Sequence, residues 1–134
     1  AFKTKVPNSL EGGKRAATPL SPAIVMKDNH PVMAIGTPGG DAIPPAILQV
    51  LLNMIVYKKS LVDAIAAARI QQSEAPDELE YEHALPQETI TALAAMGHPT
   101  TQRETIGDVQ ALMFDGGNII AVADPRHRGA AGGF

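Results

Sequence analysis

The sequence predicts an α+β fold in which helices cover an antiparallel sheet. Two stretches, residues 23–35 and 109–123, each hold two apolar runs divided by turn residues, as β-hairpins do. The stretch between them has the apolar spacing, prolines and capping residues of helices. Hairpins on both sides of a helical stretch favour an antiparallel sheet with helices packed on it. The 134 residues, 45% of them hydrophobic, suffice for one domain with its own core.

Composition excludes several kinds of partner. The formal net charge is −3 and only 4% of the residues are aromatic, so a nucleic-acid partner is not expected. The longest apolar run, residues 43–56, is shorter than the ~20 residues that cross a bilayer, so no membrane span is expected. The sequence has no cysteine, which excludes disulfides and thiolate chemistry and fits either a periplasmic or a cytoplasmic location.

Residues 1–20 are expected to form an extended arm, and residues 21–134 to form the sheet and helices. The arm is rich in Lys, Pro, Gly, Ser and Thr and has no periodicity. The first hairpin then pairs residues 23–27 with residues 31–35 across a turn of Asx type. Both runs are apolar at nearly every position, which predicts that the strands are covered on both faces.

The next element is predicted to be a helix that begins near Ala42 and ends near Tyr57. Pro44 and Pro45 fit its first turn, where proline removes no intrahelical hydrogen bond. Its polar residues lie on one narrow stripe, and a helix that is apolar on every other face is buried on almost every side. A chain of this length lacks the surface to bury such a helix. We therefore expect a missing partner, and self-association of the chain without it.

The remaining elements are shorter. Ser60 and Asp63 have capping-box spacing and open a helix that is expected to end near Arg69. A second short helix is predicted over residues 86–96, closed by Gly97. The last hairpin is predicted over residues 109–114 and 118–123 with Asp115-Gly116-Gly117 as its turn, before an irregular tail over residues 124–134.

Residues 70–82 are polar and are predicted to be a loop, with at most a strand at residues 79–82. Their carboxylates are expected to be solvated; these are Glu74, Asp77, Glu78, Glu80 and Glu82. No metal or other cofactor is expected, because the histidines lie at turn, loop or tail positions without ligand spacing. The histidines are His30, His83, His98 and His127.

The candidate site is the glycine pair Gly39 and Gly40, at the junction between a predicted strand and the long helix. Glycine permits a positive φ and close backbone approach, and the first N–H groups of a helix have no partner inside it. The pair can therefore present backbone donors to a small anion, such as the oxygen of a tetrahedral intermediate. A corner with no ligand is the alternative. Asp41 stands where a phosphate-binding loop needs a cation, so a polyphosphate is excluded.

The order of short motifs along the chain resembles the small subunit of the gamma-glutamyltransferases, also called gamma-glutamyltranspeptidases. The motifs are Asn8-Ser9-Leu10-Glu11-Gly12-Gly13-Lys14-Arg15, Leu20-Ser21-Pro22-Ala23-Ile24-Val25, Gly36-Thr37-Pro38-Gly39-Gly40, Ala67-Ala68-Arg69, Pro76-Asp77-Glu78-Leu79, Gly97-His98, Gly107-Asp108-Val109-Gln110 and Ala123-Asp124-Pro125-Arg126. The likeness runs from about Pro7 to the last residue, where Gly133-Phe134 is similar to the family's closing Gly-Tyr.

The resemblance implies the four-layer αββα fold of N-terminal-nucleophile hydrolases, with residues 1–134 as the C-terminal portion of the small subunit. Such enzymes are zymogens that cut themselves into a large and a small subunit. The large subunit and the missing N-terminal part of the small subunit would then be this chain's partners. In the family, the freed N-terminal Thr attacks a small-molecule γ-glutamyl amide such as glutathione, and its own α-amine serves as the base. Gly39 and Gly40 match the Gly-Gly motif that stabilises the oxyanion.

The sequence departs from the family pattern at two places. The nucleophilic Thr lies upstream of Ala1, so this chain alone is expected to be inactive. The family's two serines that hold the substrate's α-carboxylate are replaced by Thr18 and Pro19, and Pro19 has neither a hydroxyl nor an N–H. Three functions therefore stay open: a γ-glutamyl amide as substrate, another amide as in cephalosporin acylases and oxamate amidohydrolases, or a non-catalytic binding fragment.

Overall fold

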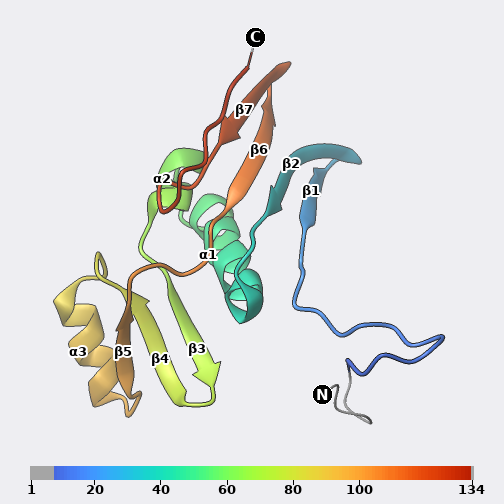
Figure 1. The fold of residues 1–134 in the computed structure, drawn as a ribbon. Helices are drawn as coiled ribbons and strands as arrows, with labels where there is room; N and C mark the ends of the chain where they lie inside the picture. The colour runs from blue at the N-terminus through green and yellow to red at the C-terminus, as the bar shows by residue number, and fades with distance from the viewer. Residues whose placement is uncertain (1–7, 134) are drawn as a thin grey trace.

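The computed structural model describes residues 8–133, which form two β-sheets with helices between and beside them (Figure 1). The first sheet has the strand order β1-β2-β6-β7, and the second has the order β3-β4-β5. The strands are β1 Ala23–Lys27, β2 His30–Gly36, β3 Ile70–Glu74, β4 Asp77–Glu82, β5 Thr100–Arg103, β6 Gln110–Asp115 and β7 Asn118–Val122. The helices are the 3-10 turn η1 Gly40–Ala42 and the α-helices α1 Ile43–Ile55, α2 Leu61–Ala66 and α3 Gln87–Ala95.

The first sheet is antiparallel throughout, and it contains both predicted hairpins. Asp28 and Asn29 turn the β1–β2 hairpin with positive φ angles, and Gly116 and Gly117 do the same between β6 and β7. In the β1–β2 register Ala23 pairs with Ile35, so the chain before β1 and the chain after β2 leave the hairpin at the same end. That end of the sheet carries the glycine junction.

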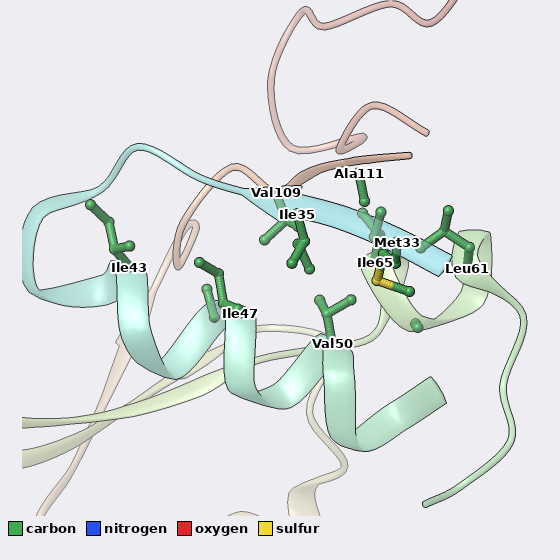
Figure 2. Close-up of a cluster of buried hydrophobic side chains, with 11 residues drawn as sticks. Met33, Ile35, Ile43, Ile47, Val50, Leu61, Ile65, Val109 and Ala111 are labelled. Atoms are coloured by element: carbon green, nitrogen blue, oxygen red, sulfur yellow. The ribbon is translucent and has the colours of Figure 1, made fainter. Parts of the chain in front are cut away.

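The hydrophobic core lies between the first sheet and the helices α1 and α2. Figure 2 shows apolar side chains of the sheet pointing toward side chains of the helices. Helix α1 contributes residues at helical spacing, which places them on one face. The cluster comprises Met33, Ile35, Ile43, Ala46, Ile47, Val50, Leu61, Ala64, Ile65, Val109 and Ala111.

Helix α1 is buried on one face only. Leu48, Leu52 and Ile55 are 56%, 41% and 54% exposed, and the sheet face turned away from α1 carries Ile24 and Ile119 at 67% and 63%. The described residues therefore do not supply the cover that the apolar pattern demands. The expected partner and the expected self-association stay predictions. In the described residues, no helix is long and apolar enough to cross a membrane.

The strand allowed at residues 79–82 is present as part of β4, but the loop prediction for the rest of residues 70–82 is wrong, because this stretch forms the β3–β4 hairpin of the second sheet. Strand β5 was not predicted at all, and it pairs with β4 in parallel. These strands lack apolar alternation, since Gln, Glu, Ser and Thr occupy most of their positions. Helix α3 contacts β5 at the edge of this sheet (Figure 1).

Most of the predicted helix ends agree with the structure. Ser60 accepts a hydrogen bond from the Asp63 N–H at 3.1 Å, as the capping box predicted. Gly97 follows α3 with a φ of 95°. Helix α2 ends at Ala66, short of the predicted Arg69. Tertiary hydrogen bonds replace the next helical turn, because the guanidinium groups of Arg69 and Arg126 donate to the carbonyl oxygen of Ile65 at the end of this helix.

The described part of the predicted arm, residues 8–20, contains turns and irregular backbone. Asn8 closes this segment on itself, because its side chain accepts from the N–H of Ala17 at 2.7 Å and donates to the carbonyl of Ala17 at 3.1 Å. Residues 1–7 and Phe134, which belong to the predicted arm and to the closing motif, lie outside the described residues.

Candidate functional site

The glycine pair forms the predicted junction between β2 and the helical segment. Gly39 has φ 136° and ψ 13°, and Gly40 has φ 58°, so both occupy backbone conformations that favour glycine. The structure differs from the prediction in one detail, because η1 intervenes before α1 begins at Ile43. The Gly39 carbonyl accepts from the Ala42 N–H at 3.1 Å, and the Gly40 carbonyl accepts from Ile43. The turn is thus closed through its carbonyls.

The N–H groups of Gly39 and Gly40 remain available as donors. Neither makes a hydrogen bond within residues 8–133, and both glycines are exposed. They lie just before the N-terminus of α1, where the helix dipole favours negative charge. Two adjacent free donors at a helix N-terminus can bind a small anion.

A second backbone segment, residues 106–109, packs against Gly39. We call residues 106–109 the strap. A Cβ atom on Gly39 would lie 3.4 Å from the Cα of Gly107, so the two backbones are in close contact. Thr37 joins them by a hydrogen bond, because its Oγ1 accepts from the N–H of Asp108 at 2.7 Å. In the sequence the strap is visible only as the motif that begins at Gly107, and no local pattern marks Thr37 as its partner.

Three buried charged residues and the partly buried Arg126 form a network next to the strap. We call Arg69, Glu82, Asp124 and Arg126 the charge cluster. Arg69 bonds Asp124 at 2.7 Å, and Arg126 bonds Glu82 at 2.5 Å and Asp124 at 3.0 Å. The side chains of Arg69 and Asp124 are 1% and 0% exposed. The pairing explains how these charges tolerate burial.

Each member of the cluster except Arg126 also bonds the backbone of the strap. Glu82 accepts from the N–H of Ile106 at 2.7 Å, and Arg69 donates to the carbonyl of Ile106 at 2.9 Å. Asp124 accepts from the N–H of Val109 at 2.8 Å. The strap is therefore fixed by charged hydrogen bonds, which are stronger than neutral ones.

Hydrogen bonding keeps both carboxylates of the cluster ionised. Burial alone would raise the pKa of Glu82, but bonds from Arg126 and from the backbone N–H groups of Arg69 and Ile106 hold that pKa below its usual range. Asp124 behaves alike: burial opposes ionisation, and bonds from the Val109 N–H, Arg126 and Arg69 lower its pKa.

The expectation that the carboxylates of residues 74–82 are solvated is wrong for Glu80 and Glu82, which are 4% and 5% exposed. Glu82 belongs to the charge cluster. Glu80 pairs with Arg103 at 2.5 Å, and this hydrogen bond lowers the pKa of Glu80. Glu74 and Asp77 are exposed, as predicted.

A cavity of about 450 Å³ with both polar and apolar walls lies between Gly39, the strap and the second sheet. Its walls include Gly39, Gly107, Glu80, Arg103 and His127. Among the described residues, no three His, Asp or Glu side chains are grouped as metal ligands would be.

Thr18 and Pro19, the predicted substrate contacts, lie in the exposed segment before β1. The Thr18 hydroxyl accepts from the N–H of Leu20 at 3.2 Å, and Ser21 donates to the carbonyl of Pro19 at 2.8 Å. The β1–β2 register places this segment and the glycine pair at the same end of the hairpin. No hydrogen bond joins the two segments within residues 8–133.

Comparison with known proteins gives a consistent assignment. The sequence profile of the gamma-glutamyltranspeptidase family matches residues 1–134. The glutathione hydrolase proenzyme of Pseudomonas aeruginosa is 36% identical over 126 residues, which cover 91% of this chain and 23% of that protein. The acylase ACY 1 proenzyme of Pseudomonas sp. strain SE83 is 32% identical over 108 residues, covering 80% of this chain and 19% of that protein.

A solved structure agrees in fold as well as in sequence. The gamma-glutamyltranspeptidase of Pseudomonas nitroreducens, complexed with L-DON, superimposes with a TM-score of 0.86 at 34% identity. The match covers 97% of this chain and 69% of that chain. The present chain thus spans about a fifth of the proenzymes and about two thirds of the solved chain it matches. Since the family profile extends over every residue and the α+β fold matches at this identity, the chain belongs to the gamma-glutamyltranspeptidase family.

Proposed function

We propose that this chain is part of an N-terminal-nucleophile amidohydrolase or acyltransferase, in which Gly39 and Gly40 stabilise the oxyanion. The observation that carries the proposal is the pair of exposed, unpaired N–H groups at the start of α1. Donors that are fixed before the reaction stabilise developing charge without reorganisation, and one such donor is worth ~2.7–4 kcal/mol of barrier.

The proposed reaction uses a nucleophile from outside this chain. The hydroxyl oxygen of an N-terminal Thr forms a bond to the amide carbon while its α-amine takes the hydroxyl proton. The carbonyl electrons move to the oxygen, and the Gly39 and Gly40 N–H groups bind the resulting anion. When the tetrahedral intermediate breaks down, its C–N bond is cleaved, and the leaving amine takes the proton from the α-amine. Water or an amino acid then attacks the carbonyl carbon of the acyl-enzyme and gives its proton to the α-amine. The ester bond to the Thr oxygen breaks, and that oxygen takes the proton back from the amine.

The open faces of this chain support an assembly with the rest of the protein. We infer that residues 1–134 are the C-terminal portion of a small subunit and that further chain completes four αββα layers. Helix α1 and the outer face of the first sheet both expose large apolar side chains, such as Leu48 and Ile24. A large subunit and the N-terminal part of the small subunit would cover these surfaces.

Two substrate classes remain candidates. A γ-glutamyl amide such as glutathione is favoured by the name of the Pseudomonas aeruginosa relative. Another amide is favoured by Pro19, which lacks the hydroxyl that typical members offer to an α-carboxylate, and by the similarity to an acylase proenzyme. A non-catalytic binding role applies to the chain taken alone.

The activity is tested with the complete protein that contains this chain. We expect it to release p-nitroaniline from γ-glutamyl-p-nitroanilide, or the acyl group from a cephalosporin-type amide. We expect replacement of the upstream N-terminal Thr by Ala to abolish release, and the isolated 134-residue chain to show no turnover. Turnover by the isolated chain, or the absence of any amide hydrolysis by the complete protein, would contradict the proposal.

Specificity is tested at Pro19. We expect Pro19→Ser in the complete protein to lower KM for γ-glutamyl substrates more than it changes kcat, because an α-carboxylate contact serves ground state and transition state alike. A hydrogen bond to a charged group is worth ~1.5–3 kcal/mol, which corresponds to about 10- to 150-fold in KM. Steady-state kinetics on glutathione and on a non-glutamyl amide provide the comparison. An equal effect on both substrates would remove Pro19 from the specificity argument.

A further inference from the structure

We propose that Thr37 is a positioning residue that fixes the direction in which the Gly39 N–H points, with the strap as its anchor. This inference rests on the proposed oxyanion role of the glycine pair. It assigns to Thr37 a role in catalysis that acts through the backbone of its neighbours rather than by contact with substrate.

The hydroxyl of Thr37 makes two hydrogen bonds at once. It donates to the carbonyl oxygen of Pro38 at 2.6 Å and accepts from the N–H of Asp108 at 2.7 Å. Both distances are short for their type, and the hydroxyl uses its single proton and one of its lone pairs. Thr37 thus links the glycine turn to a segment that is distant in sequence.

The bond to Pro38 reaches Gly39 through covalent geometry. The Pro38 carbonyl and the Gly39 N–H belong to the same peptide unit, which is planar, so fixing the oxygen fixes the plane in which the N–H lies. Gly39 itself cannot provide this order, because glycine has the widest choice of backbone angles. A hydrogen bond accepted by the carbonyl also polarises the N–H of the same amide and strengthens it as a donor.

The anchor is rigid because the charge cluster holds it. Ile106 is bonded at both its N–H and its carbonyl, and Val109 at its N–H, by buried charged side chains. Between them Gly107 has φ 72°, and a Cβ there would lie 2.9 Å from the Cβ of Ala46 and 3.3 Å from the Thr37 hydroxyl. The strap therefore packs against α1 and Thr37 so closely that there is no room for a side chain at Gly107.

The experiment compares variants of the complete protein in steady-state hydrolysis, with rates divided by the amount of matured enzyme. Thr37→Val keeps the shape and removes the hydroxyl, and we expect kcat to fall about 10- to 100-fold, since misplacement of catalytic groups by ~1 Å costs about 100-fold. We expect KM to stay within about twofold, because the oxyanion forms only in the transition state. Thr37→Ser keeps the hydroxyl and is expected to restore kcat to nearly the wild-type value. The matched control is Thr91→Val on the exposed face of α3, which should leave kcat unchanged.

Three results would overturn the inference. An unchanged kcat in Thr37→Val would show that the hydroxyl does not position the turn. An equal loss in Thr37→Ser would do the same. A rise in KM in step with the fall in kcat and a lower melting temperature would indicate a merely structural role. If Thr37→Val does not fold, the same fall in kcat is expected of Thr37→Ala, and an unchanged kcat in that variant would overturn the inference. Failure of the proposed function is distinguishable, because the wild-type protein would then hydrolyse no amide.

Discussion

Replacing Gly39 by Ala in the complete protein is expected to lower kcat about 100- to 1000-fold with little change in KM. At φ 136° an L-residue is strained, and the added Cβ would meet Gly107 at 3.4 Å and Ala42 at 3.5 Å. The turn must then shift, which moves the Gly39 N–H away from the place where we propose that the oxyanion forms, and loss of one such donor costs ~2.7–4 kcal/mol.

The control for this prediction is Gly116→Ala in the β6–β7 turn. Gly116 has φ 54°, and a Cβ there meets nothing within 4 Å, so the variant carries a positive-φ penalty of roughly 1–2 kcal/mol away from the site. Its kcat should equal that of wild type. Steady-state kinetics and a melting curve for each variant provide the measurement. A Gly39→Ala enzyme with wild-type kcat would remove the glycine pair from the mechanism.

The second large effect is expected on stability. Arg69→Ala should lower the free energy of unfolding by about 3–5 kcal/mol, because it removes the donor to the Ile106 carbonyl and one of the donors to both Asp124 and the Ile65 carbonyl, all of them buried. Arg69→Lys should recover only part of this loss, since an ammonium group cannot reproduce the planar guanidinium's three contacts. Urea unfolding of the complete protein measures the difference.

Arg128→Ala is the matched control for Arg69, because it removes the same side chain at an exposed position. Its effect should stay within ~0.5 kcal/mol. Equal unfolding midpoints for the two variants would mean that the charge cluster does not stabilise the fold. A loss confined to Arg69→Ala would show that the charge cluster stabilises the fold.

Sequence patterns predicted those features whose causes are local. The alternation and turn chemistry of residues 23–35 and 109–123 suffice to specify the two hairpins of the first sheet. The need for positive φ predicted the conformation of Gly39 and Gly40, and the capping box located the start of α2. Each of these depends on neighbours a few residues away, which a sequence displays directly.

Apart from a strand at residues 79–82, the second sheet could not be predicted, because its strands have no apolar period. The polar residues of β3 and β4 look like a solvated loop until their partners are known. Glu82 can be buried because Arg126, far along the chain, neutralises its charge. Arg69 can be buried because Asp124 neutralises the charge of Arg69. A sequence shows the charges but not their pairing.

The sequence by itself determined the family, the first sheet and the glycine pair as the candidate site. Only the tertiary structure decided that the strap lies behind that pair, that Thr37 joins the two, and that a charge cluster holds the strap. The physical reason is distance along the chain. Arg69 and Asp124 are separated by 55 positions, and Thr37 and Asp108 by 71, so folding alone brings them within hydrogen-bond reach.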